Sequence, residues 1–206
     1  MKKVVVSFIL LTVATHLNSQ NKKDTLVKKL MLGFNIGANF SNLIVNSADA
    51  NSTKIQNGAG INIGIIMEEK ITEQISLIPK AEQWFNDCSL QNSSTSTPNE
   101  EYNVLPMHTD FMLHVVYKFN KTKNKWYGLF GPNFKIPLDQ ENVSNKTYNY
   151  KTDMALDFGF GTEKNLPYFQ LAPEMRYSVG LLNLGNGSVF NKVYFHTVCL
   201  VFNFKG

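Results

Sequence analysis

The sequence predicts an all-β chain that folds as an eight-stranded antiparallel up-and-down transmembrane β-barrel. Three observations support this prediction. Polar and apolar residues alternate along eight segments, which is the pattern of strands with two different faces. Most segments are close to the roughly 9 to 11 residues that a tilted membrane strand needs, whereas strands of soluble proteins average about 5 to 6. Long and short connections also alternate along the chain, as in membrane barrels.

The first residues have the order of a secretory signal peptide. Lys2 and Lys3 precede an apolar stretch at 4–14, and a polar cleavage region ends at Ser19. A bilayer-spanning helix takes about 20 apolar residues, so this stretch is too short to be one. The alternative, a buried helix or strand, does not explain the full charged, apolar and polar order. We therefore expect a signal peptide at 1–19, a periplasmic lead at 20–30 and the barrel domain at 31–206.

Four strands are predicted in the first half of the chain, at 32–41, 60–68, 75–84 and 102–119. The first has its apolar residues at even positions, and the other three have them at odd positions. In the third strand Lys80 and Glu82 lie on the polar face. In the fourth, His108 and Asp110 share a face opposite a run of Leu, Met, Phe and Val. Each strand therefore has one face suited to lipid and one suited to a polar interior.

Four more strands are predicted in the second half, at 125–136, 153–163, 169–179 and 192–204. The first of these alternates less clearly than the rest. The next sets Asp157 and two glycines against phenylalanines, and the third sets Glu174 and Arg176 against Leu, Met and Tyr. The last strand again has its apolar residues at even positions. This brings the predicted strands to eight.

The connections and the aromatic residues agree with a membrane barrel. Long links at 42–57, 86–101, 139–152 and 182–191 alternate with short ones, and a soluble meander has no reason to gather its long loops at one rim. Tyr and Trp favour the interfacial belts of a bilayer, although ordinary core packing is the alternative. The aromatic residues that we expect in these belts are Trp84, Tyr102, Tyr117, Phe119, Trp126, Tyr127, Tyr168 and Phe169.

The polar faces should fill the interior of the barrel. Eight strands leave a lumen only wide enough for side chains, and the backbone groups must all pair within a closed sheet. Acids and bases are mixed on these faces, so they can neutralise each other. We expect a salt-bridged plug, not an open pore. The residues assigned to this structural network are Lys80, Glu82, His108, Asp110, Asp157, Glu174 and Arg176, joined by His114, Lys118, Asp153 and Glu163.

Composition excludes several classes of function. The formal net charge is +4, but part of the excess lies in Lys2 and Lys3. No run of Lys or Arg exceeds two residues, so a nucleic-acid partner is not expected. Of the two cysteines, Cys88 falls in a predicted loop and Cys199 in the middle of a strand, so we expect no disulfide between them.

No pattern of catalytic or ligand-binding residues stands out. His108 and His114 are six residues apart, about 20 Å along a strand, too far for a shared metal when zinc–nitrogen bonds are about 2 Å. A G-x-S-x-G nucleophile motif is absent from the sequence. The glycines at 159 and 161 lie within a strand and lack the dinucleotide-binding fingerprint. We therefore expect no catalytic residue, no cofactor and no metal site.

Several short motifs resemble those of PorT-like outer-membrane β-barrel proteins. They occur, in order and over most of the chain after the signal peptide, at 37–41, 105–107, 128–132, 157–163, 171–178 and 180–183. The resemblance implies an eight-stranded barrel in the outer membrane, and the founding member of the family is associated with protein secretion across that membrane. Lys80, where an acidic residue is expected, and Lys205 and Gly206 after the last aromatic residue depart from the family's pattern.

The function that follows is structural or interactive, with secretion as one setting. We expect a monomeric barrel in the outer membrane, reached through a cleaved signal peptide, with lipid and secretion-complex proteins as its partners. One alternative is a lipid-modifying barrel enzyme, because His108 and Asp110 share a face. Another is a soluble lipocalin-like binding protein, whose eight strands bury apolar side chains inside.

Overall fold

The computed structural model describes residues 30–46, 53–92, 100–119, 125–138, 142–143, 146–147, 151–185 and 192–206. The predicted signal peptide and all but residue 30 of the predicted lead lie outside these ranges, so the domain boundaries stay predictions. The strands are β1 (Leu30–Asn46), β2 (Thr53–Gln56), β3 (Gly58–Lys70), β4 (Ile75–Asn86), β5 (Ser89–Asn92), β6 (Glu100–Asn103), β7 (Met107–Lys118), β8 (Lys125–Pro137), β9 (Asn142–Val143), β10 (Lys146–Thr147), β11 (Asp153–Asn165), β12 (Gln170–Gly180) and β13 (Lys192–Lys205).

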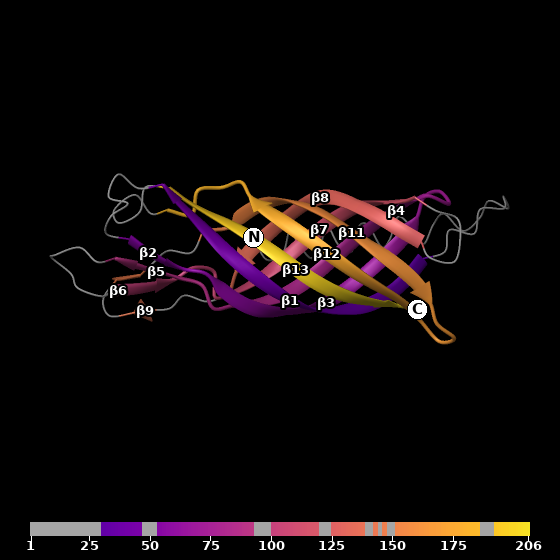
Figure 1. Cartoon of the computed structure of the whole chain (residues 1–206), viewed down its shortest axis with the longest axis horizontal. Helices are drawn as coiled ribbons and strands as arrows, with labels where there is room; N and C mark the ends of the chain where they lie inside the picture. The colour runs from indigo at the N-terminus through magenta and orange to yellow at the C-terminus, as the bar shows by residue number, and fades with distance from the viewer. Residues whose placement is uncertain are drawn as a thin grey trace, which may run out of the picture.

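Eight of these strands form one closed antiparallel barrel in the order β1-β13-β12-β11-β8-β7-β4-β3 (Figure 1). Each strand follows its sequence neighbour around the barrel, apart from the short strands of the connections. The seam between β1 and β13 extends to the last residue, where the backbones of Leu32 and Gly206 exchange two hydrogen bonds of 3.2 and 2.8 Å. The predicted eight-stranded antiparallel barrel is confirmed.

The strands are strongly tilted, as the register around the barrel shows. The partners of Phe40, taken strand by strand, lead back to β1 at Leu30, an offset of ten residues (40 − 30). An offset of this size goes with a tilt of roughly 35 to 45°. The tilt explains why strands of 11 to 17 residues fit a bilayer whose core is about 30 Å thick.

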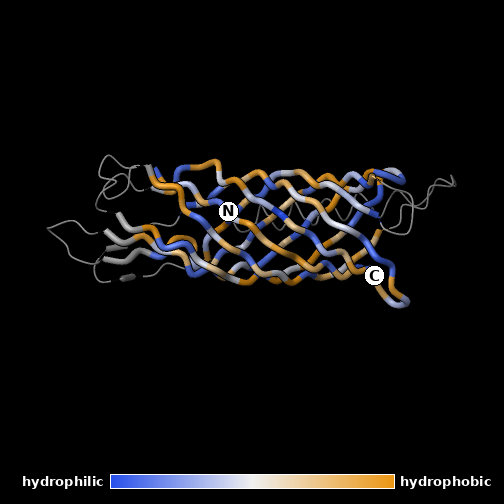
Figure 2. The backbone as a smooth tube through the Cα atoms, viewed as in Figure 1, coloured by the Kyte–Doolittle hydropathy of each residue, from blue (hydrophilic) through white to orange (hydrophobic). Residues whose placement is uncertain are grey.

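Apolar side chains face outward and polar ones face inward. Phe34 is 55% exposed, whereas Asp157 and Arg176 are buried. Hydrophobic and hydrophilic residues alternate along the barrel strands in Figure 2. A lipocalin has the opposite orientation, with its apolar side chains inside, so the lipocalin-like alternative is wrong. Among the residues that the structure describes, no helix is long and apolar enough to cross a membrane.

The two ends of the barrel differ. At the turn end, β3 and β4 are joined by residues 71–74 and β11 and β12 by residues 166–169. At the loop end, β2, β5 and β6 form a separate three-stranded sheet that extends beyond the barrel (Figure 1). The predicted segregation of short and long connections is therefore confirmed for the described residues.

The predicted strand at 102–119 is in fact two strands. β6 ends at Asn103 and β7 begins at Met107, with a bend between them. Leu105 in this bend has a φ of 50°, a left-handed conformation that a strand does not contain and that a leucine adopts only under local constraint. The following Pro106 lacks an N–H for the ladder. β6 therefore pairs with β5 in the loop-end sheet, while β7 belongs to the barrel.

Five of the eight residues predicted for the aromatic belts are exposed, two are not, and the side chain of Tyr102 lies outside the described residues. Tyr117, Phe119 and Trp126 are exposed on the outer face. Trp84 and Tyr127 are instead buried in the lumen, because their positions have the inward parity of β4 and β8. Nearness to a strand end therefore does not by itself place an aromatic residue in a belt.

Candidate functional site

The most distinctive feature of the chain is its lumen, which side chains fill in successive layers. At the turn end, two acids and two lysines form a ring that we call the basal quartet: Glu68, Lys118, Glu163 and Lys205. Each lysine ammonium contacts both carboxylates, at 2.7 and 3.0 Å from Lys118 and 2.6 and 2.9 Å from Lys205. The four residues come from β3, β7, β11 and β13, every second strand of the barrel, so the quartet closes the lumen symmetrically.

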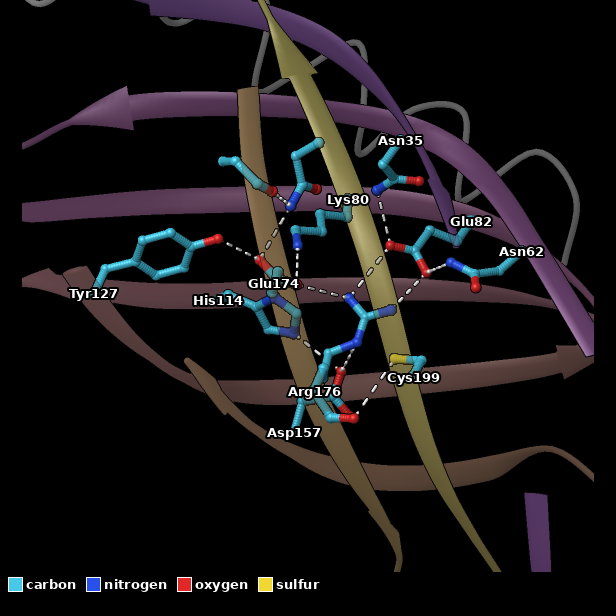
Figure 3. A network of polar contacts seen from close by, with 12 residues as sticks. Asn35, Asn62, Lys80, Glu82, His114, Tyr127, Asp157, Glu174, Arg176 and Cys199 are labelled. Atoms are coloured by element: carbon cyan, nitrogen blue, oxygen red, sulfur yellow. Dashed lines mark hydrogen bonds and ion pairs between the residues drawn. The ribbon is translucent and has the colours of Figure 1, made fainter. Parts of the chain in front are cut away.

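The middle of the lumen holds a second layer, the central cluster, drawn in Figure 3. Its members are Lys80, Glu82, His114, Asp157, Glu174 and Arg176. Lys80 pairs with Glu174 at 2.7 Å. Arg176 contacts Glu82 at 2.6 Å, Glu174 at 3.5 Å and Asp157 at 3.7 Å. Arg176 therefore contacts Glu174, its neighbour on the same face of β12, but its main partner is Glu82.

Glu82 is the most heavily hydrogen-bonded of these carboxylates. Its oxygens accept hydrogen bonds from the amides of Asn35 and Asn62 at 2.8 and 3.0 Å, and from the indole N–H of Trp84 at 3.1 Å. Arg176 adds two more, at 3.2 and 2.6 Å. A buried carboxylate is stable only with such partners, so the neighbouring strands are fixed around Glu82.

Above the central cluster lies the upper group, His108, Asp110, Asn133, Lys135 and Asp153. Lys135 pairs with Asp110 at 3.1 Å, and the Nε2 atom of His108 lies 3.3 Å from the other oxygen of Asp110. The Lys135 ammonium also lies 5.2 Å from the ring centre of Trp84, within the range of a cation–π contact. Cations and aromatic rings thus share this layer.

An apolar cap lies at the loop end, beyond the upper group. Its core consists of Leu43, Cys88, Leu90, Val104, Leu105, Leu184, Val193 and Phe195. These residues come from the ends of β1 and β13, from β5 and from the connections around them. Burial in this cluster raises the pKa of the Cys88 thiol to about 12, and the nearby Asp87 acts in the same direction. Cys88 and Cys199 are free, as expected.

The seven residues assigned to the network from sequence are all buried: Lys80, Glu82, His108, Asp110, Asp157, Glu174 and Arg176. Sequence reasoning missed Lys135, Glu68, Lys205 and Tyr127. Parity would have found Lys135 and Tyr127, because Phe130 and Phe134 already fix the outward positions of β8. Lys205, treated as a departure from the family's pattern, instead completes the basal quartet.

The arrangement is that of a closed plug. The ionised groups contact one another, and both His108 and Asp110 are fully buried. Within the described ranges, no group of three or more His, Cys, Asp or Glu side chains is placed to hold a metal ion. The layers also block the lumen at the turn end, in the middle and at the loop end.

Comparison with known families agrees with this architecture. The family model for the outer membrane protein beta-barrel domain matches residues 18–186. The chain belongs to this family. Membership of this family places the barrel in the outer membrane. A comparison with curated proteins finds no match.

Solved structures that this chain resembles include those of three bacterial proteins. The attachment invasion locus protein Ail of Yersinia pestis is 14% identical, with 85% of this chain and 98% of Ail covered and a TM-score of 0.45. Neisserial surface protein A is 12% identical over 84% of this chain and 97% of its own, with a TM-score of 0.45. The N-terminal barrel domain of Pseudomonas aeruginosa OprF is 13% identical over 84% and 97%, with a TM-score of 0.40.

Proposed function

We propose that this protein is a structural outer-membrane barrel with a non-conducting lumen, which anchors the loop-end sheet and presents it to partner proteins outside the cell. The observation that carries the proposal is the plugged lumen. The side chains of the basal quartet, the central cluster and the apolar cap fill the interior of the barrel. A barrel with such an interior acts through its outer surface and its loops, and long loops of this class face outward.

The loop-end sheet is the surface best placed for a partner. It extends beyond the barrel (Figure 1), and the apolar cap joins it to β1 and β13 through Leu90, Leu43 and Phe195. Ile55 in β2 is 45% exposed. Because the sheet extends beyond the membrane-anchored barrel on the side of the long loops, Ile55 lies where another protein could contact it.

A role as an accessory of protein secretion is the more specific form of the proposal, and the PorT-like motifs support it. The test compares culture supernatants of a deletion strain carrying either the full chain or its Ile55→Glu variant. We expect the deletion to remove a set of exported proteins that the full chain restores and the variant restores less well. An unchanged supernatant in the deletion strain would eliminate the secretion role.

The absence of enzymatic activity is also part of the proposal. A lipid-modifying enzyme must bring a lipid to its catalytic groups, and His108 and Asp110 are buried between the central cluster and the apolar cap. The measurement is the mass spectrum of lipid A and phospholipids. We expect identical spectra from the deletion strain and its parent; a missing lipid species would instead support the enzyme.

The remaining proposals concern export and assembly. Residues 1–19 act as a cleaved signal peptide, so the mature chain should begin at Gln20, which N-terminal sequencing checks.

The closed barrel leaves no open edge on which a second copy could continue the sheet, which supports a lipid-surrounded monomer. Planar bilayers containing the purified protein should show no conductance steps, in contrast to a porin measured in parallel.

A further inference from the structure

The central cluster contains one carboxylate more than it has permanent cations. Its acids are Glu82, Asp157 and Glu174, and its permanent cations are Lys80 and Arg176. All five side chains are buried. An uncompensated charge is strongly unfavourable in a low-dielectric interior, and this interior is enclosed by a sheet whose outer face meets lipid.

Neighbouring layers cannot supply the missing positive charge. The basal quartet has two acids and two lysines in mutual contact, and an apolar layer that includes Ile66, Ile78 and Val116 lies next to it. In the upper group, Lys135 interacts with Asp157 but pairs more closely with Asp110 and also faces Asp153. If Lys135 neutralised the central cluster, Asp110 and Asp153 of the upper group would lack a permanent cation instead.

His114 is the one group of the central cluster that can gain a positive charge. Its Nε2 atom lies 3.0 Å from Oδ2 of Asp157, and Figure 3 shows the ring between Asp157 and Glu174. Four charged groups face the ring. Burial opposes a charge on the ring most strongly, and Lys80 on β4 and Arg176 on β12 act in the same direction, while Asp157 on β11 and Glu174 on β12 favour the charge.

We propose that His114 and Asp157 form a proton-binding site that keeps His114 as an imidazolium in the folded barrel at neutral pH. With that proton the central cluster has three negative and three positive groups. Loss of the proton leaves one buried carboxylate uncompensated. Arg176 must then balance Asp157 as well as Glu82 and Glu174. The plug is therefore sensitive to pH at this position, independently of any partner at the loop end.

The test is nitrogen NMR of the full-length mature protein in lipid nanodiscs, with ¹⁵N-labelled histidine. His196 on the outer face, which pairs with the Tyr177 hydroxyl at 3.0 Å, serves as the internal comparison. The variants His196→Gln and His108→Gln assign the signals of the other two histidines of the mature chain. At pH 7.5 we expect both ring nitrogens of His114 in the protonated range and one nitrogen of His196 in the unprotonated range. A His114 ring with one unprotonated nitrogen between pH 6 and 7.5 overturns the proposal.

Two further variants distinguish a charge-balance effect from burial alone. Asp157→Asn removes the extra carboxylate, so His114 should lose its proton and one nitrogen should shift to the unprotonated range. Glu69→Gln makes the same chemical change outside the central cluster and should leave the His114 signals unchanged. If Asp157→Asn folds and His114 stays doubly protonated, the pairing with Asp157 is not the cause and the proposal fails. If Asp157→Asn does not fold, the unmodified protein alone decides.

Discussion

Arg176 on β12 and Glu82 on β4 form a two-pronged ion pair across the lumen, with Nη2–Oε2 and Nη1–Oε1 distances of 2.6 and 3.2 Å. The strands are not neighbours: β3, β1 and β13 separate them on one side of the barrel, and β11, β8 and β7 on the other. A bond between side chains from opposite walls braces the barrel across its interior. Its loss should therefore affect the whole structure and not one hairpin.

Replacement of Arg176 by methionine should destabilise the barrel by about 3 to 5 kcal/mol, because removal of one partner leaves buried carboxylates uncompensated. Urea unfolding in lipid vesicles, followed by the mobility shift on heating, measures this loss. Lys164→Met, at an exposed position of β11, is the matched control and should change little. Adding Glu82→Gln to Arg176→Met should recover part of the stability; a simple sum of losses would contradict the pairing.

Replacement of Lys205 by methionine should loosen the turn end selectively. Glu68 and Glu163 would then share Lys118 alone, at a cost of about 3 kcal/mol. Hydrogen exchange at the amides of Leu32 and Gly206, which close the seam, should accelerate. Lys192→Met, exposed at the other end of β13, supplies the comparison, and equal exchange in the two variants would argue against the quartet as the lock of this seam.

A methyl group at Gly161 should disrupt the packing of Tyr127. A Cβ at this position would run into the Tyr127 ring and its hydroxyl, which donates to Glu174 at 3.1 Å. We expect Gly161→Ala to cost about 1 to 3 kcal/mol and to change the near-ultraviolet circular dichroism of the tyrosines. Gly128→Ala is the control, since its added methyl would only touch the Phe119 ring at 3.3 Å.

A charge on the lipid face should interfere with membrane stability. Ile65, in the middle of β3, is 68% exposed and meets hydrocarbon in the membrane. Ile65→Arg should destabilise the folded barrel by about 2 to 4 kcal/mol, whereas Ile65→Leu should be close to neutral. The midpoint of unfolding in vesicles gives both values. A neutral Ile65→Arg would mean that this face does not contact lipid.

The Cys88 thiol should stay unreactive until the apolar cap opens. Its pKa is raised to about 12 by burial, so the nucleophilic thiolate is scarce at any pH well below that value. In a Cys199→Ala background, maleimide labelling at pH 7.5 should therefore be negligible in the folded protein and complete after heating in SDS. Fast labelling of the folded barrel at neutral pH would show that the cap is not closed.

Alternation of residue types was sufficient to predict most of the barrel. The parity of β1, β3 and β12 follows from a single rule, that each side chain faces lipid or lumen, and this rule also placed Glu174 and Arg176 inside. The same rule does not predict which of the inward-facing residues pair with each other. Arg176 and Glu82 are 94 residues apart in sequence, and their contact depends on the tilt and register of strands that share no edge.

Loop-end features could not be predicted from the same rule. The bend at Leu105 depends on backbone strain that the apolar cap compensates, because Val104 and Leu105 are buried in it. Trp84 was misplaced because tryptophan is common both in interfacial belts and in cores. Its indole N–H points to Glu82 inside the barrel, and only the inward parity of β4 distinguishes the two cases.

The basal quartet favours the correct register of β13 when the barrel closes. Its member Lys205 lies on β13, the strand that closes the barrel against β1. Glu68 and Glu163 therefore both depend on the position of this one ammonium group. If β13 slipped by two residues, Asn203 would replace Lys205 opposite those glutamates, and a neutral amide cannot satisfy both. A misaligned cylinder would thus carry an electrostatic defect at its base, and the correctly aligned one is the arrangement in which that defect disappears.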